Sequence, residues 1–359
     1  MLMNVPKTLH LFAILLVSLL LLLAYGEAST DDLTAARPCR KLKFTAQPEP
    51  AIALSWITPM RSDDKKKLDL WCDTVGPALL RSPQEPGPSR EGRIIVVNWN
   101  VHLGNGNVLE LIDELTADER KAGRGEPHFV FLLQEAFRRG IDVPSEIRSD
   151  ASVPGRIPSS ADDIEALARK LDWWMFYVPS MRNGKQSGAA AEDRGNAILS
   201  SLPLEGLDAI ELPFSVQRRV AVAATVHDRD RAHRFRVTTV HLDTRAPLSR
   251  GFIFGASAAR NGQAKWVAEA VAGPSSEGLS LIVGGDLNSF WGAFESSVDT
   301  LVKVAPQVDC GGKATHKLGF TLDHMFARFS SLLAPVSCRR PDNRFGSDHY
   351  PLILSLTPA

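Results

Sequence analysis

Ionisable and amide side chains recur at one kind of position in this sequence, the carboxyl end of a strand-like apolar run. Four of them are Asn100 in "VVNWN", Glu135 in "FLLQE", and Asp286 and Asn288 in "IVGGDLN". A single carboxylate at such a position is usually a turn former, but strand ends are also where ligand sites of α/β sheets assemble. The repetition predicts one shared polar site.

Histidines and further aspartates occupy equivalent positions later in the chain. His241 closes "TTVHLD", Asp323 interrupts "FTLDHMFA", and Asp348 and His349 directly precede the apolar run "YPLIL". Histidine and carboxylate side chains transfer protons and stabilise charge that develops during hydrolysis. The complete set therefore indicates a hydrolytic site rather than a series of unrelated turns.

The elements that would position these residues are alternating strands and helices from residue 93 onward. Apolar runs typical of buried strands include 93–100, 128–136, 235–243 and 279–288, and helical spacing of apolar residues occurs at 107–122, 160–171 and 261–272. Strands outnumber helices, and several adjacent strands are close enough to form hairpins. We therefore predict an α/β fold of two packed mixed sheets with helices outside.

Two segments have less regular sequence patterns than these strands and helices. Residues 29–90 contain many prolines and are predicted to form an irregular extension with at most one short helix, ending in a Pro-rich linker at 81–90. Residues 249–263 carry Phe252, Ile253 and Phe254 between glycines. We expect this segment to be a loop whose apolar tip contacts substrate or folds back over the sheet edge.

The order of seven short motifs resembles the endonuclease/exonuclease/phosphatase superfamily, which includes secreted DNases, abasic-site endonucleases, neutral sphingomyelinases and inositol-polyphosphate phosphatases. The motifs are "NWN", "LLQEA", "RGNAILS", "TTVHLD", "GGDLNS", "LDHM" and "GSDHYPL". The resemblance covers residues 93–359. It implies a four-layer α/β/β/α sandwich (DNase I-like) and a catalytic domain at 91–359.

Residue chemistry assigns roles beside this resemblance. Hard oxygen ligands without a cysteine or histidine cluster favour Mg²⁺ or Mn²⁺ over zinc, with Glu135 as the best ligand and Asn100 as a second. Such a metal polarises a phosphoryl oxygen and neutralises charge on the leaving group. Asp286 would orient or deprotonate the attacking water, and the Asn288 amide would hold the phosphate.

The resemblance supplies the remaining catalytic roles. It pairs His349 with Asp323 and places Asp348 toward the metal. Asp323 would fix the imidazole tautomer and raise the pKa of His349, favouring its charged form. The protonated His349, together with His241, would then donate hydrogen bonds to the non-bridging phosphate oxygens.

The sequence departs from the resemblance at one position. Abasic-site endonucleases commonly have an aspartate two residues after the first-motif asparagine, and this chain has His102 there. His102 is a candidate phosphate contact or a structural residue beside a Gly-rich turn. Arg194 and Arg219 are further candidate phosphate-binding residues, because forked guanidinium groups suit phosphate, although arginines also serve surface solvation. Asn196, in the motif "RGNAILS", is another candidate.

The N-terminal segment predicts export. Lys7 precedes an apolar run from Leu11 to Ala24, and small residues follow, as in a secretory signal peptide spanning residues 1–28. An uncleaved membrane anchor is the alternative. Export favours disulfides among the four cysteines, Cys39, Cys72, Cys310 and Cys338. Pairing of sequence neighbours is preferred among three connectivities, with free buried thiols as the alternative.

The composition excludes some classes of protein but does not identify the substrate. The chain has 359 residues with 41 Lys+Arg and 41 Asp+Glu, so its net charge of +0 excludes a strongly basic nucleic-acid coat and an acidic tail. We predict an exported, metal-dependent phosphodiester hydrolase of the nuclease type that uses in-line attack by water. Alternatives are a lipid-headgroup phosphodiesterase of the sphingomyelinase type and a phosphomonoesterase. A non-catalytic binding module is disfavoured because every catalytic position carries a competent residue.

Overall fold

The computed structural model describes residues 37–45, 52–59, 62–84, 92–145, 152–153, 162–183, 191–228, 231–244 and 254–358. The predicted signal peptide at 1–28 lies outside these ranges. So do residues 85–90 of the predicted linker and residues 249–253 of the predicted loop. Within the described ranges, no helix is long and apolar enough to span a bilayer.

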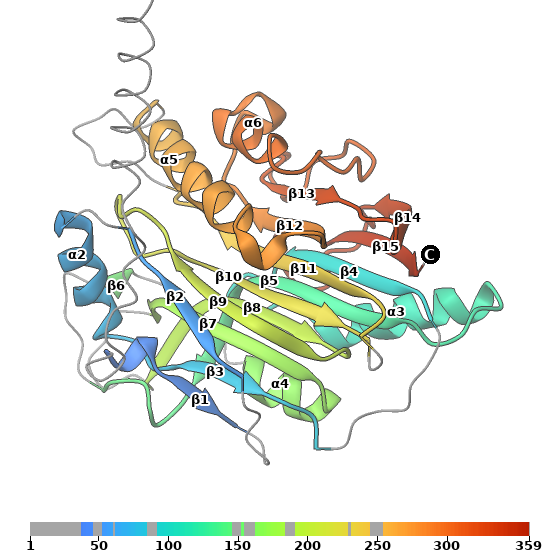
Figure 1. Cartoon of the computed structure of the whole chain (residues 1–359), viewed down its shortest axis with the longest axis horizontal. Coiled ribbons are helices and arrows are strands. Elements are labelled where there is room, and N and C mark those ends of the chain that lie inside the picture. The colour runs from blue at the N-terminus through green and yellow to red at the C-terminus, as the bar shows by residue number, and fades with distance from the viewer. Residues whose placement is uncertain are drawn as a thin grey trace, which may run out of the picture.

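Two mixed β-sheets form the centre of the molecule (Figure 1). The nine-stranded sheet has the order β1-β3-β7-β8-β5-β4-β15-β14, and β6 pairs with β7. Its strands are β1 (Leu42–Phe44), β3 (Ala78–Arg81), β4 (Ile94–Asn100), β5 (His128–Arg139), β6 (Ser152–Val153), β7 (Trp174–Asn183), β8 (Glu192–Ser200), β14 (Leu333–Arg339) and β15 (Leu352–Pro358).

The six-stranded sheet has the order β13-β12-β11-β10-β9-β2. Its strands are β2 (Leu54–Ile57), β9 (Leu204–Glu211), β10 (Val220–His227), β11 (Arg234–His241), β12 (Ser280–Asp286) and β13 (Asp323–Arg328). The helices are α2 (Ser62–Cys72), α3 (Val108–Lys121), α4 (Ile164–Leu171), α5 (Phe254–Val271) and α6 (Ser296–Val302), with short 3₁₀ turns η2 (Pro38–Arg40), η4 (Pro274–Ser276) and η5 (Gly292–Phe294).

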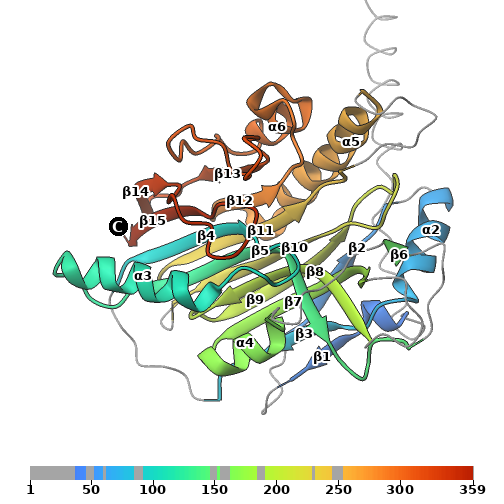
Figure 2. The ribbon, with the colours of Figure 1, turned by 180° about the vertical axis from the view of Figure 1, so that it is seen from behind.

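Helices cover both outer faces of the stacked sheets. In both views α5 and α6 lie on one side of the sheets, and α3 and α4 lie on the opposite side (Figure 1, Figure 2). Three apolar clusters correspond to this layering: one between the sheets, one under α3 and α4, and one under α5 and α6. The predicted four-layer α/β/β/α sandwich is confirmed.

The alternation of side chains along β4 explains why the central strands are apolar throughout. Ile94 and Val96 point into the core between the sheets, and Ile95 and Val97 point toward α3. Both faces of the strand are therefore buried, because successive side chains point to opposite faces. The sequence of a strand that is buried on both faces is therefore an unbroken apolar run.

The segment before residue 90 differs from the sequence expectation. It contains β1, β2, α2 and β3 rather than an irregular chain. β1 pairs with β3, β3 pairs with β7, and β2 pairs with β9. These runs of three or four residues are too short to show periodicity, and they become strands because existing sheet edges supply hydrogen-bond partners.

The predicted loop at 249–263 is also wrong in part, because α5 already begins at Phe254. The helix therefore starts seven residues before the helical spacing predicted at 261–272. The earlier stretch "FGASAAR" is rich in small residues and lacks the spacing of large apolar side chains on which the prediction depended.

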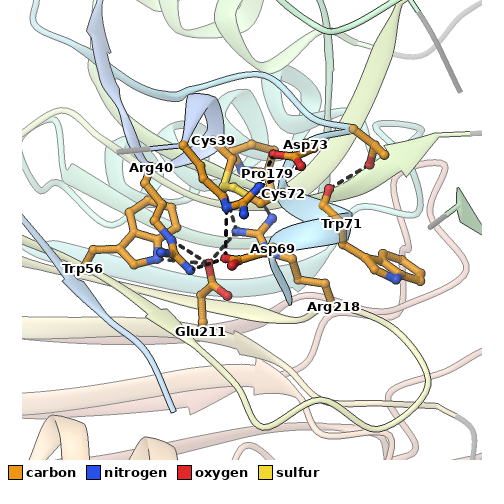
Figure 3. Close-up of a disulfide and its surroundings, with 12 residues drawn as sticks. Cys39, Arg40, Trp56, Asp69, Trp71, Cys72, Asp73, Pro179, Glu211 and Arg218 are labelled. Carbon is orange, nitrogen blue, oxygen red and sulfur yellow. Dashed lines mark hydrogen bonds and ion pairs between the residues drawn. A yellow bond between two sulfur atoms is a disulfide. The ribbon is translucent and has the colours of Figure 1, made fainter. Parts of the chain in front are cut away.

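Two disulfides, Cys39–Cys72 and Cys310–Cys338, confirm the predicted pairing of sequence neighbours. Figure 3 shows the first of them beside a buried ionic group. Arg218 donates to Glu211 at 3.2 Å, and one of its nitrogens lies 3.5 Å from the Cys39 sulfur. Trp56 Nε1 also donates to Glu211, at 3.0 Å. The disulfide thus secures the N-terminal segment against a fully buried ion pair.

Replacing both cysteines of the first disulfide, Cys39→Ala/Cys72→Ala, should lower the free energy of unfolding by about 3–4 kcal/mol, because the closed loop restricts the unfolded chain. Urea denaturation followed by far-UV circular dichroism measures the change. Cys310→Ala/Cys338→Ala opens the other disulfide, whose cysteines are 28 residues apart instead of 33, and should lower the free energy of unfolding by a similar amount. An unchanged urea midpoint in the first variant would contradict the proposed anchoring.

Candidate active site

Three adjacent strands of the six-stranded sheet place His241, Asp286 and Asp323 side by side. The parallel register of β11 and β12 pairs His241 with Asp286, and the antiparallel register of β12 and β13 pairs Asp286 with Asp323. All three side chains are buried. Gly285 permits this close approach, because a Cβ there would lie 2.2 Å from the Val240 carbonyl oxygen.

The nine-stranded sheet contributes the ends of β4 and β5. The parallel register pairs Asn100 with Gln134. Asn100 Nδ2 donates to Asp286 Oδ2 at 2.9 Å, so this bond connects the two sheets. Gln134 Nε2 forms a second connection, because it donates to Asn98 Oδ1 and to Thr239 Oγ1, each at 2.9 Å. The site therefore lies where the ends of both sheets meet.

Glu135 lies at an irregularity of β5. The pairing of β5 with β8 shifts register between Leu133 and Ala136, and Glu135 has a φ of 54°. A positive φ is strained for a non-glycine residue, and such bulges redirect side chains near active sites. Asp348 is the main cause of the raised pKa of His102, to which Glu135 adds, and burial lowers the pKa of Arg194 against the opposing effect of Glu135, so the charge of Glu135 acts on both groups.

Hydrogen bonds hold the segment of Ser347, Asp348 and His349 at the end of β4. Ser347 Oγ donates to the Asn100 carbonyl oxygen at 2.7 Å, and the His349 amide donates to Ser347 Oγ at 3.0 Å. Trp99 Nε1 donates to the His349 carbonyl oxygen at 3.1 Å. Ser347, which was not among the predicted site residues, thus orients the two ionisable groups that follow it.

His349 forms the predicted pair with Asp323, with 2.7 Å between Nδ1 and Oδ2. Its other nitrogen, Nε2, lies 3.8 Å from Asp286 Oδ2. Burial lowers the pKa of His349, but the carboxylates of Asp323, Asp286 and Asp348 outweigh burial and raise it to about 10. His349 is therefore a cation at neutral pH.

His241 has the opposite protonation state. Burial lowers its pKa well below the ordinary value, and the positive charges of Arg219, His349 and Arg194 lower it further. Its Nε2 lies 3.5 Å from Asp286 Oδ2 and has no hydrogen-bond partner among the described residues. A neutral imidazole can still donate one hydrogen bond from that nitrogen.

Asp286 lies between these two histidines. Its Oδ1 accepts from the Asn288 amide at 2.9 Å, and its Oδ2 accepts from Asn100. Burial raises the pKa of Asp286 to about 6, despite the opposing effect of His349. Asn288 has a φ of 49°, and its Nδ2 donates to the Leu242 carbonyl oxygen at 3.0 Å, which fixes the amide beside Asp286.

Two histidines and a lysine surround the Asp348 carboxylate. His102 Nδ1 lies 3.1 Å from Oδ1, and His316 Nε2 and Lys317 Nζ each lie 3.6 Å from Oδ2. Burial raises the pKa of Asp348, but His102 and the other histidines outweigh burial and hold the pKa below its ordinary value. His102 therefore contacts Asp348, and its contact with phosphate, the first of the two predicted roles, stays a prediction.

Sequence reasoning missed His316. It precedes β13 in an irregular segment, "ATHKLGF", and no strand end marks it. A bridge pairs it with His349, and the two imidazole rings lie 4.7 Å apart. The only local signal was another histidine seven residues before Asp323, which is too weak to identify a site residue.

The three other candidate phosphate-binding residues differ in whether their side chains are already engaged. Arg194 and Arg219 both lower the pKa of His241, so both charges act at the site. Arg219 Nε lies 3.4 Å from Asp243 Oδ1, and Asn196 Nδ2 donates to the Val220 carbonyl oxygen at 2.7 Å. Arg194 is the least committed of the three, since its guanidinium contacts the Met181 sulfur.

The donor chemistry fits a hard divalent cation. Asn100, Glu135 and Asp348 offer oxygen atoms, the ligand type that Mg²⁺ and Mn²⁺ prefer. No described residue forms a hydrogen bond or ion pair with the Glu135 carboxylate, which leaves it available as a ligand. The potential ligand atoms of Asp286, Asp323 and His349 also lie within 4.8 Å of one another, although the pairing of His349 with Asp323 occupies that histidine.

Fold and site together define the DNase I-like class of α/β sandwich. Residues 97–349 match the profile of the Endonuclease/Exonuclease/phosphatase family, and the chain therefore belongs to this family, whose members are hydrolytic phosphoesterases.

Two solved structures are similar to this chain, and the first of them shows the same fold. An endonuclease/exonuclease/phosphatase from Beutenbergia cavernae DSM 12333 is 18% identical, with a TM-score of 0.51 over 75% of this chain and 72% of that chain. The human Nocturnin catalytic domain with bound sulfate anion is 16% identical, with a TM-score of 0.49 over 75% of this chain and 94% of that chain. Comparison with curated proteins gives no match.

The charge on His349 can be tested directly by NMR titration of its imidazole. We expect a midpoint near pH 10, because Asp323 and its neighbouring carboxylates favour the cation. The folded-state pKa lies above the ordinary 6.5, so this charge stabilises the fold fully below pH 6.5 and the stabilisation is lost as pH rises through about 10.

Asp323→Asn should lower that midpoint by about 1–3 pH units, because it removes the nearest negative charge. Asp228→Asn removes the carboxylate beside His233, outside the site, and should leave the His349 midpoint unchanged. Titration of His349 near 6.5 in the unmodified protein would contradict the pairing.

Proposed function

We propose that the protein is an exported, divalent-metal-dependent phosphodiester hydrolase. The observation that carries the proposal is Asp286, a buried carboxylate that accepts from Asn100 and Asn288 and lies between neutral His241 and cationic His349. Such a group suits the activation of water beside a bound phosphate, because its raised pKa brings it closer to neutral pH.

The two histidines bind the phosphoryl group in this proposal. His349 donates from Nε2 as a cation held by Asp323, and neutral His241 donates from its unpartnered Nε2. Both nitrogens lie within 4 Å of the same Asp286 oxygen, so their hydrogens converge on one place. Fixed donors at that place stabilise the negative charge that grows on the non-bridging oxygens.

Asp286 orients the attacking water and accepts its proton. Above pH about 6 the carboxylate is ionised and can accept this proton. The Asn100 amide holds one carboxylate oxygen, and the Asn288 backbone amide holds the other. The carboxylate therefore keeps one orientation, which aligns the water for in-line attack.

Asn100, Glu135 and Asp348 would hold Mg²⁺ or Mn²⁺. When bound, the ion supplies Lewis-acid polarisation of a phosphoryl oxygen and neutralises charge on the leaving group. The positive φ of Glu135 directs its carboxylate out of the regular β5 alternation, and His102 holds Asp348 in place. Arg194 would add a guanidinium contact to phosphate.

Export is supported by two disulfides, which persist in oxidising compartments. It is also supported by the apolar segment of residues 11–24 behind Lys7, which we assign to a signal peptide. Because an exported enzyme meets its substrate outside the cytoplasm, we expect the substrate there.

Hydrolysis of bis-p-nitrophenyl phosphate in the presence of Mg²⁺ tests the proposed reaction. Asp286→Asn should lower kcat by on the order of 100-fold or more, because the amide cannot accept the proton of water. Asp299→Asn changes an exposed aspartate on α6 and should leave kcat unchanged. Full turnover in a folded Asp286→Asn variant would refute the assigned role.

Glu135→Gln keeps the side-chain shape but removes one negative charge from the metal site. Mg²⁺ affinity measured by isothermal titration calorimetry should fall on the order of tenfold. Glu114→Gln, an exposed change on α3, is the matched control and should bind Mg²⁺ as the unmodified protein does. Equal affinity in all three proteins would exclude Glu135 as a ligand.

A further inference from the structure

Exposed apolar side chains concentrate next to the proposed active site. Of the nine large hydrophobic residues that are exposed among the described residues, five lie in two loops, and we call these five the apolar rim. They are Phe290, Trp291, Phe294, Leu318 and Phe320. Contiguous exposed apolar surface is uncommon on a soluble protein and marks an interaction site.

The two loops of the apolar rim are neighbours, and both begin at the site. The rings of Phe290 and Phe320 lie 5.5 Å apart, edge to face. Ser289 Oγ also donates to the Thr321 carbonyl oxygen at 3.1 Å. The first loop follows Asn288 directly, and the second follows His316, whose ring contacts His349. The rim is therefore part of the site entrance.

Three side chains of the rim extend furthest into solvent. Trp291, Phe294 and Leu318 are 62%, 94% and 68% exposed. Trp291 is the N-cap of the 3₁₀ turn η5 and Phe294 is its last residue, and the Phe294 amide donates to the Trp291 carbonyl oxygen. Residues three apart in a 3₁₀ turn lie on the same side, so both rings project together.

A polar hollow adjoins the rim. Its volume is about 500 Å³, and its walls include His102, Lys317, Asp342, Arg344 and Asp348. Lys317 is the residue before Leu318 of the rim, so the two surfaces are continuous. The hollow presents both cationic and anionic groups, whereas the rim presents neither. A ligand that covers both must be polar at one end and apolar at the other.

We infer that the apolar rim docks the protein on a zwitterionic phospholipid bilayer, so that the phosphodiester of a lipid headgroup enters the site. This inference rests on the proposed phosphodiesterase function. The rim would enter the interface, where tryptophan and phenylalanine are favoured, and the hollow would hold the headgroup.

The charges beside the rim favour a lipid over a nucleic acid. Between residues 289 and 321, Lys303, Lys313 and Lys317 are balanced by Glu295, Asp299 and Asp309. A groove for single-stranded nucleic acid requires positive charge along the backbone and open aromatic faces.

The rim lacks the first requirement, because these charges balance, and meets the second only at Trp291 and Phe294. The Arg260 guanidinium lies 5.8 Å from the Phe290 ring centre and covers that ring, and Leu318 has no ring on which a base could stack. A neutral bilayer needs only apolar surface, which the rim provides.

Flotation with phosphatidylcholine vesicles tests the inference on the purified full-length protein without requiring turnover. The variant Trp291→Ser/Phe294→Ser/Leu318→Ser should bind vesicles at least about tenfold more weakly, because it removes the apolar surface that enters the interface. The matched control is Leu332→Ser/Val336→Ser. These two exposed apolar residues follow Arg328, the end of β13 that is distant from Asp323, and the control variant should float as the unmodified protein does.

Turnover of bis-p-nitrophenyl phosphate should be equal in all three proteins, because a small soluble diester does not reach the rim. Failure of the unmodified protein to float, or equal flotation of the rim variant, would overturn the inference. Weaker binding of a single-stranded oligonucleotide by the rim variant, with unchanged flotation, would overturn it in favour of base stacking. Absence of soluble-diester turnover in a protein that floats would overturn the proposed function alone.

Discussion

The hydrogen bond from Asn100 to Asp286 is the interaction on which the site depends, because it crosses from one sheet to the other at 2.9 Å. A buried carboxylate is unfavourable unless its oxygens are paired. Asp286 therefore requires the end of β4, the Asn288 amide and the two flanking histidines to be in place together. The site is therefore complete only when the two sheets are stacked on each other.

Several polar contacts between the sheets lie near the site, at Asn100 and Gln134, beside an apolar region between the same sheets. Gln134 bridges Asn98 and Thr239, and Val96 and Ile282 belong to the apolar cluster between the sheets. This division matters chemically. The apolar core fixes the distance between the sheets, and the polar ends then meet in a dry environment where charge interactions are strong.

The N-terminal segment stabilises the same assembly from the edges. Its strands extend both sheets, and the disulfide Cys39–Cys72 packs against Arg218 and Glu211. Arg218 also donates to the Pro179 carbonyl oxygen of β7 and directly precedes Arg219, whose charge acts on His241. A segment that was predicted to be an irregular extension is thus connected, through Arg218 and its neighbour Arg219, to His241 of the site.

The sequence by itself determined the central strands, two packed mixed sheets with outer helices and the set of strand-end residues, because apolar runs and strand-end motifs are local patterns. It also indicated the pair of His349 with Asp323 through the family resemblance. Only the tertiary structure decided the rest. The strands before residue 90 form through hydrogen bonds to distant sheet edges, and the contact of His316 with His349 arises where two loops meet. Neither leaves a local pattern, because pairing between strands and contacts between loops join residues far apart in the chain.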